Sequence, residues 1–282
     1  MSRDDRCIGV FDSGIGGLTV VRALQTRLPN EHIVYFGDTA RVPYGIKSGE
    51  TVTRFARENC DFLMRFDPKM LVVACNTASA AALPAIEAEV RLPMCGVVEP
   101  GAREAVLRSS GGTIAVIATE ATINSDAYRR AMQHYATDVR VVQKSCPLFV
   151  PLAEEGRRCD DPITRSVVRD YLDPVVRLAP RVLVMGCTHY PLLREAIAEV
   201  MGPDVLLVDS GEQTARAVVS RLESDGLLAA RDAPGRLSFY VSDNPQRFRE
   251  LGQRFLHRPV VDVTWISPEQ FFAQDVERVA NA

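Results

Sequence analysis

The sequence predicts an α/β fold with two similar lobes, each a parallel sheet covered by helices, related by a pseudo-two-fold duplication and enclosing a cleft. Three observations support this prediction. Short, fully apolar segments alternate with segments of helical length, as in parallel sheets that are buried on both faces. Polar or glycine-containing turns follow several of the apolar segments, at the strand ends where such sheets bind ligands. The order of segments then repeats along the chain, which indicates a duplication.

Length and composition exclude several classes of protein. The chain has 282 residues, which suits two domains or one large one. Apolar residues make up 46% and charged residues 24%, with 18 glycines and 17 prolines, so collagen-like and disordered chains are excluded. The net charge of −3 comes without a basic stripe, so we expect no direct binding to nucleic acid. Apolar stretches fall short of the ~20 residues that span a membrane, and we expect no membrane association.

The first unit is expected to begin with an apolar strand over residues 7–11. This strand ends in a glycine-rich turn at residues 12–17, and a helix follows from Leu18 to Leu28. Further apolar runs and amphipathic stretches predict strands at 33–36, 70–74 and 94–98, a long helix at about 49–66, and an Ala-rich helix just after Thr77.

The middle of the chain appears as a second copy of this plan. Strands are expected at 113–118, 139–142 and 181–186, with a proline-containing loop at 146–151. Ile8 and Ile114 lie 106 positions apart, and Cys75 and Cys187 lie 112 apart, so the offset is nearly constant. From about residue 210, a helix, a strand at 237–241 and a helix at 244–256 are expected to fold back onto the first unit. The predicted lobes are therefore residues 1–98 plus 210–282, and residues 99–209.

Cysteine usage bears on the cellular compartment. The seven cysteines form no C-x-x-C pair, which argues against a disulfide framework and a zinc ribbon. The charged residues 1–6 lead directly into the first strand, so no signal peptide is expected. Together these features predict a cytoplasmic protein.

Two of the cysteines stand at equivalent points of the duplicated units. Cys75 follows one apolar strand and precedes Asn76-Thr77, while Cys187 follows another and precedes Thr188-His189. A helix N-terminus after each cysteine would favour a thiolate. If the lobes face each other, one thiolate and one thiol on opposite sides of a small substrate form a two-base proton-exchange device.

Structural interpretations of the same residues stay open on the pattern alone. A cysteine at a strand end is commonly a packing residue, Asp12 and Ser13 could cap a helix, and His189 could be a buried imidazole. The cluster of Gly14, Gly16 and Gly17 lacks the third glycine of a dinucleotide fingerprint and the lysine of a phosphate loop, so it suits a small anion better than a nucleotide. The four histidines are too scattered to indicate a metal site.

At the level of motifs, the chain resembles the bacterial glutamate racemases of the cofactor-independent aspartate/glutamate racemase family. The resemblance covers nearly the whole chain and weakens after about residue 225. It rests on six segments in family order: residues 9–17 (GVFDSGIGG), 35–40 (YFGDTA), 43–45 (PYG), 75–79 (CNTAS), 146–152 (CPLFVPL) and 186–191 (GCTHYP).

The resemblance implies a reversible interconversion of L-glutamate and D-glutamate without cofactor or metal, supplying D-glutamate for peptidoglycan. It makes Cys75 and Cys187 the two bases, with Asp12 assisting Cys75, and His189 and Glu154 assisting Cys187. By the same resemblance, the residues that hold the amino acid are Asp12, Ser13, Tyr44, Gly45, Asn76, Thr77, Thr119, Thr122, Thr188 and His189. The resemblance also suggests a homodimer.

Three other functions compete with this one. An aspartate racemase of the same superfamily typically has Glu after the second Cys-Thr, where this chain has His189. A decarboxylase on the same fold would need only one catalytic cysteine, whereas this chain has both. The third is a non-catalytic role, including the gyrase inhibition associated with some family members.

Overall fold

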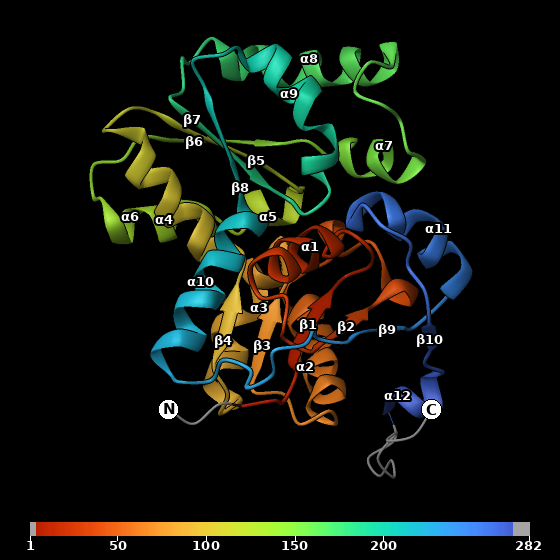
Figure 1. Ribbon diagram of the computed structural model, residues 1–282. Helices are drawn as coiled ribbons and strands as arrows, with labels where there is room; N and C mark the ends of the chain where they lie inside the picture. The colour runs from red at the N-terminus through yellow and green to blue at the C-terminus, as the bar shows by residue number, and fades with distance from the viewer. Residues whose placement is uncertain (1–3, 273–282) are drawn as a thin grey trace.

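The protein contains two separate parallel sheets. The structure, a computed structural model, describes residues 4–272. The six-stranded sheet has the order β10-β9-β2-β1-β3-β4 and the four-stranded sheet the order β6-β5-β7-β8. All the strand pairs in both sheets are parallel. Figure 1 shows the two sheets stacked, with the four-stranded one uppermost.

The six-stranded sheet is built from both ends of the chain, with the strands β1 (Ile8–Asp12), β2 (Ile33–Gly37), β3 (Met70–Val73), β4 (Met94–Gly96), β9 (Leu237–Val241) and β10 (Val263–Trp265). Its strand β1 alternates: Ile8 and Val10 pack on one face, and Phe11 packs on the other. The first face is covered by α1 (Leu18–Arg27), α10 (Ser210–Ser224) and α11 (Pro245–Leu256), and the second by α2 (Gly49–Met64), α3 (Asn76–Glu89) and α12 (Pro268–Phe272). Two short 3-10 turns, η1 (Thr39–Arg41) and η2 (Tyr44–Ile46), follow β2.

The four-stranded sheet is formed by the middle of the chain, from β5 (Ile114–Ala118), β6 (Val141–Ser145), β7 (Val182–Gly186) and β8 (Leu206–Asp209). One face packs against α4 (Val98–Ser109) and α6 (Ala127–Tyr135). The other packs against α7 (Phe149–Glu155), α8 (Pro162–Val176), the turn η3 (Tyr190–Leu193) and α9 (Arg194–Met201). The short helix α5 (Glu120–Asn124) follows β5 directly.

The predicted α/β class with two parallel sheets is confirmed, with local differences. Residues 149–151 begin the helix α7 and are not part of a loop, because a proline is tolerated in the first turn of a helix, where its missing N–H costs no hydrogen bond. The strands β8 and β10 were not predicted; β8 is only partly buried and β10 is short and half exposed. Across residues 4–272, no helix is both long and apolar enough to cross a membrane.

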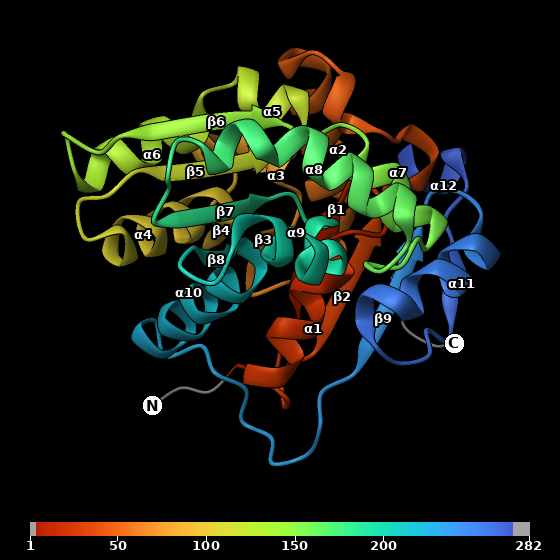
Figure 2. The ribbon, with the colours of Figure 1, turned by 90° about the horizontal axis from the view of Figure 1, so that it is seen from above.

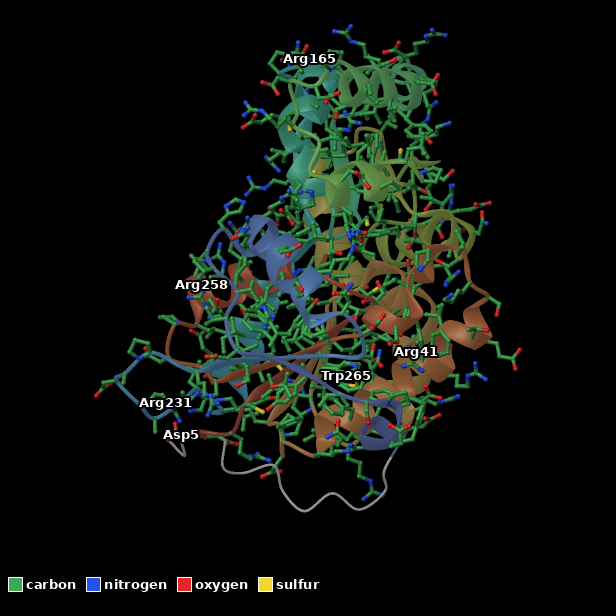
Figure 3. The ribbon with its side chains drawn as sticks, turned by 90° about the vertical axis from the view of Figure 1, so that its right-hand side faces the viewer. Asp5, Arg41, Arg165, Arg231, Arg258 and Trp265 are labelled. Carbon is green, nitrogen blue, oxygen red and sulfur yellow. The ribbon has the colours of Figure 1, made fainter. Side chains whose placement is uncertain are left out.

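The two sheets meet so that strand ends from both face a common region. Viewed from above, α7, which packs on the four-stranded sheet, lies beside α11, which packs on the six-stranded sheet (Figure 2). In the side view, Arg165 lies at the far end of the molecule from Arg41 and Trp265 (Figure 3). We propose that the lobes divide as the sequence predicts, into residues 1–98 plus 210–282 and residues 99–209, with the crossings at the starts of α4 and α10. Residues 1–3 and 273–282 of the first lobe lie outside the described residues.

Candidate active site

A cavity of about 430 Å³ lies where the two sheets face each other. Its walls come from turns after β1, β3, β5 and β7, from the η2 turn, and from α7 and α11. Most of the residues predicted from the sequence line it: Ser13, Tyr44, Gly45, Cys75, Asn76, Thr77, Thr119, Glu154, Cys187, Thr188 and His189. Asp12 and Thr122 do not line it, but each lies directly behind a residue that does.

Cys75 forms the cap of α3. Its Sγ accepts a hydrogen bond from the Ala78 N–H at 3.4 Å, and the thiol faces the Ser13 hydroxyl at 3.6 Å. Burial, and next the charge of Asp12, raise the pKa of Cys75 to about 12. The donors Ala78 and Ser13 only partly offset this effect, so near neutral pH this sulfur is a thiol.

Asp12 ends β1 and is fully buried. Its Oδ2 accepts a hydrogen bond from the Gly14 N–H at 2.9 Å. Burial raises the pKa of Asp12, against the charge of His189 and the donated backbone N–H groups. Gly17 packs closely on this carboxyl, because a Cβ there would lie 2.5 Å from the Asp12 Cβ. Asp12 lies near enough to Cys75 for its charge to raise the pKa of that thiol.

Cys187 belongs to a chain of polar groups on the other lobe. Its Sγ lies 3.9 Å from Nδ1 of His189, and Nε2 of His189 lies 3.1 Å from Oε1 of Glu154. Burial disfavours charge on His189, but the contacts with Cys187 and Glu154 outweigh it and raise the pKa of His189 to about 10. The same hydrogen bond from His189 lowers the pKa of Glu154. The imidazole is therefore a cation near neutral pH, and it lies beside the sulfur of Cys187.

Three threonine hydroxyls meet where the two lobes touch. Thr77 Oγ1 lies 3.0 Å from Thr119 Oγ1 and 3.2 Å from Thr122 Oγ1, and the last two lie 3.0 Å apart. Thr119 also caps α5, accepting from the Thr122 N–H at 3.4 Å. Thr122 is thus buried behind two cavity-lining threonines, and the cluster offers several O–H donors to an anionic group.

The opposite wall is the turn that carries Tyr44 and Gly45. The Tyr44 hydroxyl donates to the buried carboxylate of Asp38, which also pairs with Arg41 at 2.7 Å. Burial, then the negative charge of Asp38, raise the pKa of Tyr44, so it stays protonated. Gly45 packs on Thr119, where an added Cβ would come within 3.0 Å. These contacts fix the turn against the threonine cluster of the other lobe.

The glycine-rich turn after β1 packs on the second cysteine motif. A Cβ on Gly16 would lie 2.4 Å from both Nδ1 of His189 and Oγ1 of Thr188. Thr19, two residues beyond Gly17, donates to the carbonyl of Thr188 at 3.0 Å. Gly16 therefore allows a close backbone approach to protein side chains, whereas the predicted approach to a small anion stays a prediction.

Sequence reasoning missed three charged residues of the cavity: Glu120, Glu155 and Arg247. Arg247 lies on α11, and its Nη2 is 3.9 Å from Oε2 of Glu154. No sequence signal marked Arg247, since it falls in the part of the chain where the family motifs weaken. Within residues 4–272, no cluster of three or more His, Cys, Asp or Glu side chains could hold a metal ion.

Comparison with known proteins places this geometry in a family. The family model described as Asp/Glu/Hydantoin racemase matches residues 16–218. A glutamate racemase from Geobacter metallireducens is 48% identical over 264 residues, covering 94% of this chain and 97% of the relative. The chain belongs to the Asp/Glu/hydantoin racemase family. It is therefore an isomerase of the amino-acid racemase class.

Solved structures of racemases share the fold. A glutamate racemase from Bacillus anthracis superposes with a TM-score of 0.89 at 37% identity, covering 92% of this chain and 97% of the other. A glutamate racemase from Francisella tularensis, solved in complex with D-glutamate, gives a TM-score of 0.87 at 40% identity, covering 94% and 98%. The two-lobed architecture of this racemase is thus that of the glutamate racemases.

Proposed function

We propose that this racemase interconverts L-glutamate and D-glutamate by a two-base mechanism in which Cys75 and Cys187 act on opposite faces of the substrate. The observation that carries the proposal is that the two sulfurs come from different lobes yet line one cavity. Each has its own supporting group, Asp12 behind Cys75 and the His189–Glu154 pair beside Cys187.

The proton transfers balance within the pair of sulfurs. One sulfur, as thiolate, removes the α-proton and becomes a thiol, while the other thiol gives its proton to the opposite face of the α-carbon and becomes a thiolate. Only C–H and S–H bonds form and break, so no oxidant or reductant is needed. After each turnover the thiol and the thiolate have exchanged places. The starting protonation state is restored by the reverse reaction or by proton exchange with solvent.

Stabilisation of the intermediate is the harder requirement, since a proton beside a carboxylate is a very weak acid. The hydroxyls of Ser13, Thr77 and Thr119 provide fixed polar groups around the cavity. Preorganised donors of this kind stabilise developing negative charge far better than mobile water does. Glutamate is favoured as the substrate because the relatives at 48% identity are glutamate racemases.

The decisive experiment is exchange of the α-proton of D-glutamate in D₂O without added cofactor, followed by chiral analysis. Wild type is expected to give deuterated L-glutamate, and both Cys75→Ser and Cys187→Ser are expected to lose racemisation by at least ~1000-fold. Exchange of aspartate in place of glutamate would overturn the substrate assignment. Retained racemisation in either variant would overturn the two-base assignment.

Supply of D-glutamate for peptidoglycan, a homodimeric assembly and a cytoplasmic location belong to the same proposal. They rest on the resemblance to the glutamate racemases. Size measurement in solution tests the dimer directly, and complementation of a D-glutamate auxotroph tests the cellular role.

A further inference from the structure

A buried hydrogen-bond cluster outside the cavity connects the two cysteine motifs. Asn76, next to Cys75, donates from Nδ2 to the Tyr128 hydroxyl at 2.8 Å and to Ser210 Oγ at 3.4 Å. Ser210 Oγ in turn donates at 3.2 Å to the carbonyl of Met185, two residues before Cys187. All three polar side chains are buried, with exposures of 3% or less.

The last member of this chain fixes the direction of every hydrogen bond in it. A carbonyl oxygen can only accept, so the single hydroxyl hydrogen of Ser210 is committed to Met185. Ser210 Oγ can then only accept from Asn76, so the end of the amide that reaches it at 3.4 Å must be the nitrogen Nδ2. The same nitrogen donates to the Tyr128 hydroxyl oxygen at 2.8 Å.

This direction determines which end of the Asn76 amide is left for a ligand. With Nδ2 held by Tyr128 and Ser210, the oxygen Oδ1 is buried and has no hydrogen-bond partner among the described residues 4–272. Asn76 lines the cavity. A buried carbonyl oxygen without a donor is costly, so a ligand that donates a hydrogen bond to it gains binding energy.

We propose that Tyr128 and Ser210 are positioning residues that hold the Asn76 amide with its oxygen toward the cavity, where it accepts a hydrogen bond from the ammonium group of the substrate. The inference deepens the proposed function and rests on it for the identity of the amino acid. It adds a specific requirement: the site selects for an N–H donor on the substrate, through two residues that never touch it. If the amide turned over, Asn76 would offer N–H donors to an ammonium group, which cannot accept them.

Tyr128 also has a packing role, which the test must separate from the hydrogen bond. Its ring lies against the backbone of Gly186, where an added Cβ would come within 2.9 Å of Cε2. Tyr128→Phe keeps the ring and removes only the hydroxyl. Tyr135→Phe is a matched control on the same helix. Tyr135 is 43% exposed, and its hydroxyl donates a hydrogen bond to Glu99, which does not line the cavity.

The experiment compares two ligands that differ in the ammonium group. Binding of D-glutamate and of glutarate, which lacks the amino group, is measured by calorimetry for wild type, Tyr128→Phe and Tyr135→Phe. We expect Tyr128→Phe to weaken glutamate binding about tenfold, which is ~1.4 kcal/mol, and to change glutarate binding less than about twofold. In racemisation assays the same loss should appear in KM, with kcat nearly unchanged. Tyr135→Phe should match wild type.

Equal weakening of both ligands, or no weakening of either, would overturn the inference, since a merely structural role does not discriminate by the ammonium group. Failure of wild type to bind glutamate would overturn it as well. If wild type binds glutamate but does not racemise it, the proposed function fails while the comparison of ligands still decides the inference.

A second variant keeps the inference testable if Tyr128→Phe folds poorly. In Ser210→Ala the hydroxyl that fixes the direction of the amide is lost, so Asn76 can turn over and accept from the Tyr128 hydroxyl through Oδ1. We therefore expect the same selective loss of glutamate binding, and no further loss in the double variant, because both residues act on Asn76 through one chain. Additive losses would show independent effects and contradict the inference.

Discussion

The two reactive sulfurs have unequal surroundings. The Cys75 sulfur lies beside neutral hydrogen-bonding groups and the buried carboxyl of Asp12. Burial together with the charge of Asp12 raises the pKa of its thiol to about 12. Cys187 lies 3.9 Å from an imidazole whose pKa is raised to about 10, so a cation stands beside this sulfur near neutral pH. The imidazolium of His189 therefore stands beside only one of the two sulfurs, and a buried carboxyl stands beside the other.

This asymmetry predicts the order of alkylation. At about pH 7.5, iodoacetamide should modify Cys187 before Cys75, because alkylation needs the thiolate and the raised pKa of Cys75 keeps that sulfur protonated. His189→Asn should slow modification of Cys187 about tenfold. The difference between wild type and this variant should shrink as the pH rises through about 10, where the His189 imidazolium loses its proton. Peptide mass spectrometry gives the rates, and earlier modification of Cys75 would contradict the assignment.

A second prediction at the scale of single residues concerns the substitution of Arg247. Its guanidinium is the cross-lobe partner of Glu154 at 3.9 Å, but its side chain is 58% exposed, so the pair is screened by water. Arg247→Gln should lower kcat/KM only about two- to fivefold, and Arg247→Lys should retain most of the activity. The effect should fade at high salt. Loss beyond about a hundredfold would mean that Arg247 touches the substrate.

Among the elements that shape the cavity, the glycine-rich turn after β1 leaves no room for a side chain at Gly16. Gly16→Ala would place a Cβ 2.4 Å from the Nδ1 of His189 and the Oγ1 of Thr188, so the turn or the second cysteine motif must shift. We expect at least a hundredfold loss of kcat, since small displacements of catalytic groups are expensive. Gly49→Ala is the control, because its Cβ meets only the Ala81 Cβ at 4.0 Å. Equal activity of both variants by racemisation assay would contradict this role.

The elements also show what the sequence could and could not predict. Strands such as β3 and β7 were predictable because every residue is apolar, which is diagnostic of a strand buried on both faces. The helix α7 was not, because Pro151 resembles a helix breaker when its position in the first turn is unknown. That helix carries Glu154, so the error concerned an element that shapes the cavity.

At the level of the site, residues that directly follow a strand were predictable, and residues brought in by tertiary packing were not. Cys75 and Cys187 stand where the apolar runs end. By contrast, Asn76 forms hydrogen bonds with Tyr128 and Ser210, which lie 52 and 134 positions away in the sequence. A contact of that separation depends on how the two sheets dock, and neither periodicity nor composition reports on docking.

At the scale of the whole molecule, a few polar contacts join the two lobes across the cavity. Thr77 bonds Thr119 at 3.0 Å, Thr19 bonds the Thr188 carbonyl at 3.0 Å, and Arg247 pairs with Glu154 at 3.9 Å. Each such contact contributes on the order of 1 kcal/mol net, so separating the lobes at this edge costs only a few kcal/mol. A ligand held by both lobes supplies free energy of that size.

We therefore expect the lobes to close on the substrate. Closure excludes water, which strengthens the electrostatic interactions that must stabilise the carbanion and prevents it from being protonated by solvent. Small-angle scattering should show a smaller radius of gyration with saturating D-glutamate than without ligand, and no change with the same concentration of D-lysine. The chain crosses between the proposed lobes near residues 98 and 210, so the motion should be a hinge about these crossings. An unchanged radius with D-glutamate would mean that water is excluded by the cavity walls as they stand, without movement of the lobes.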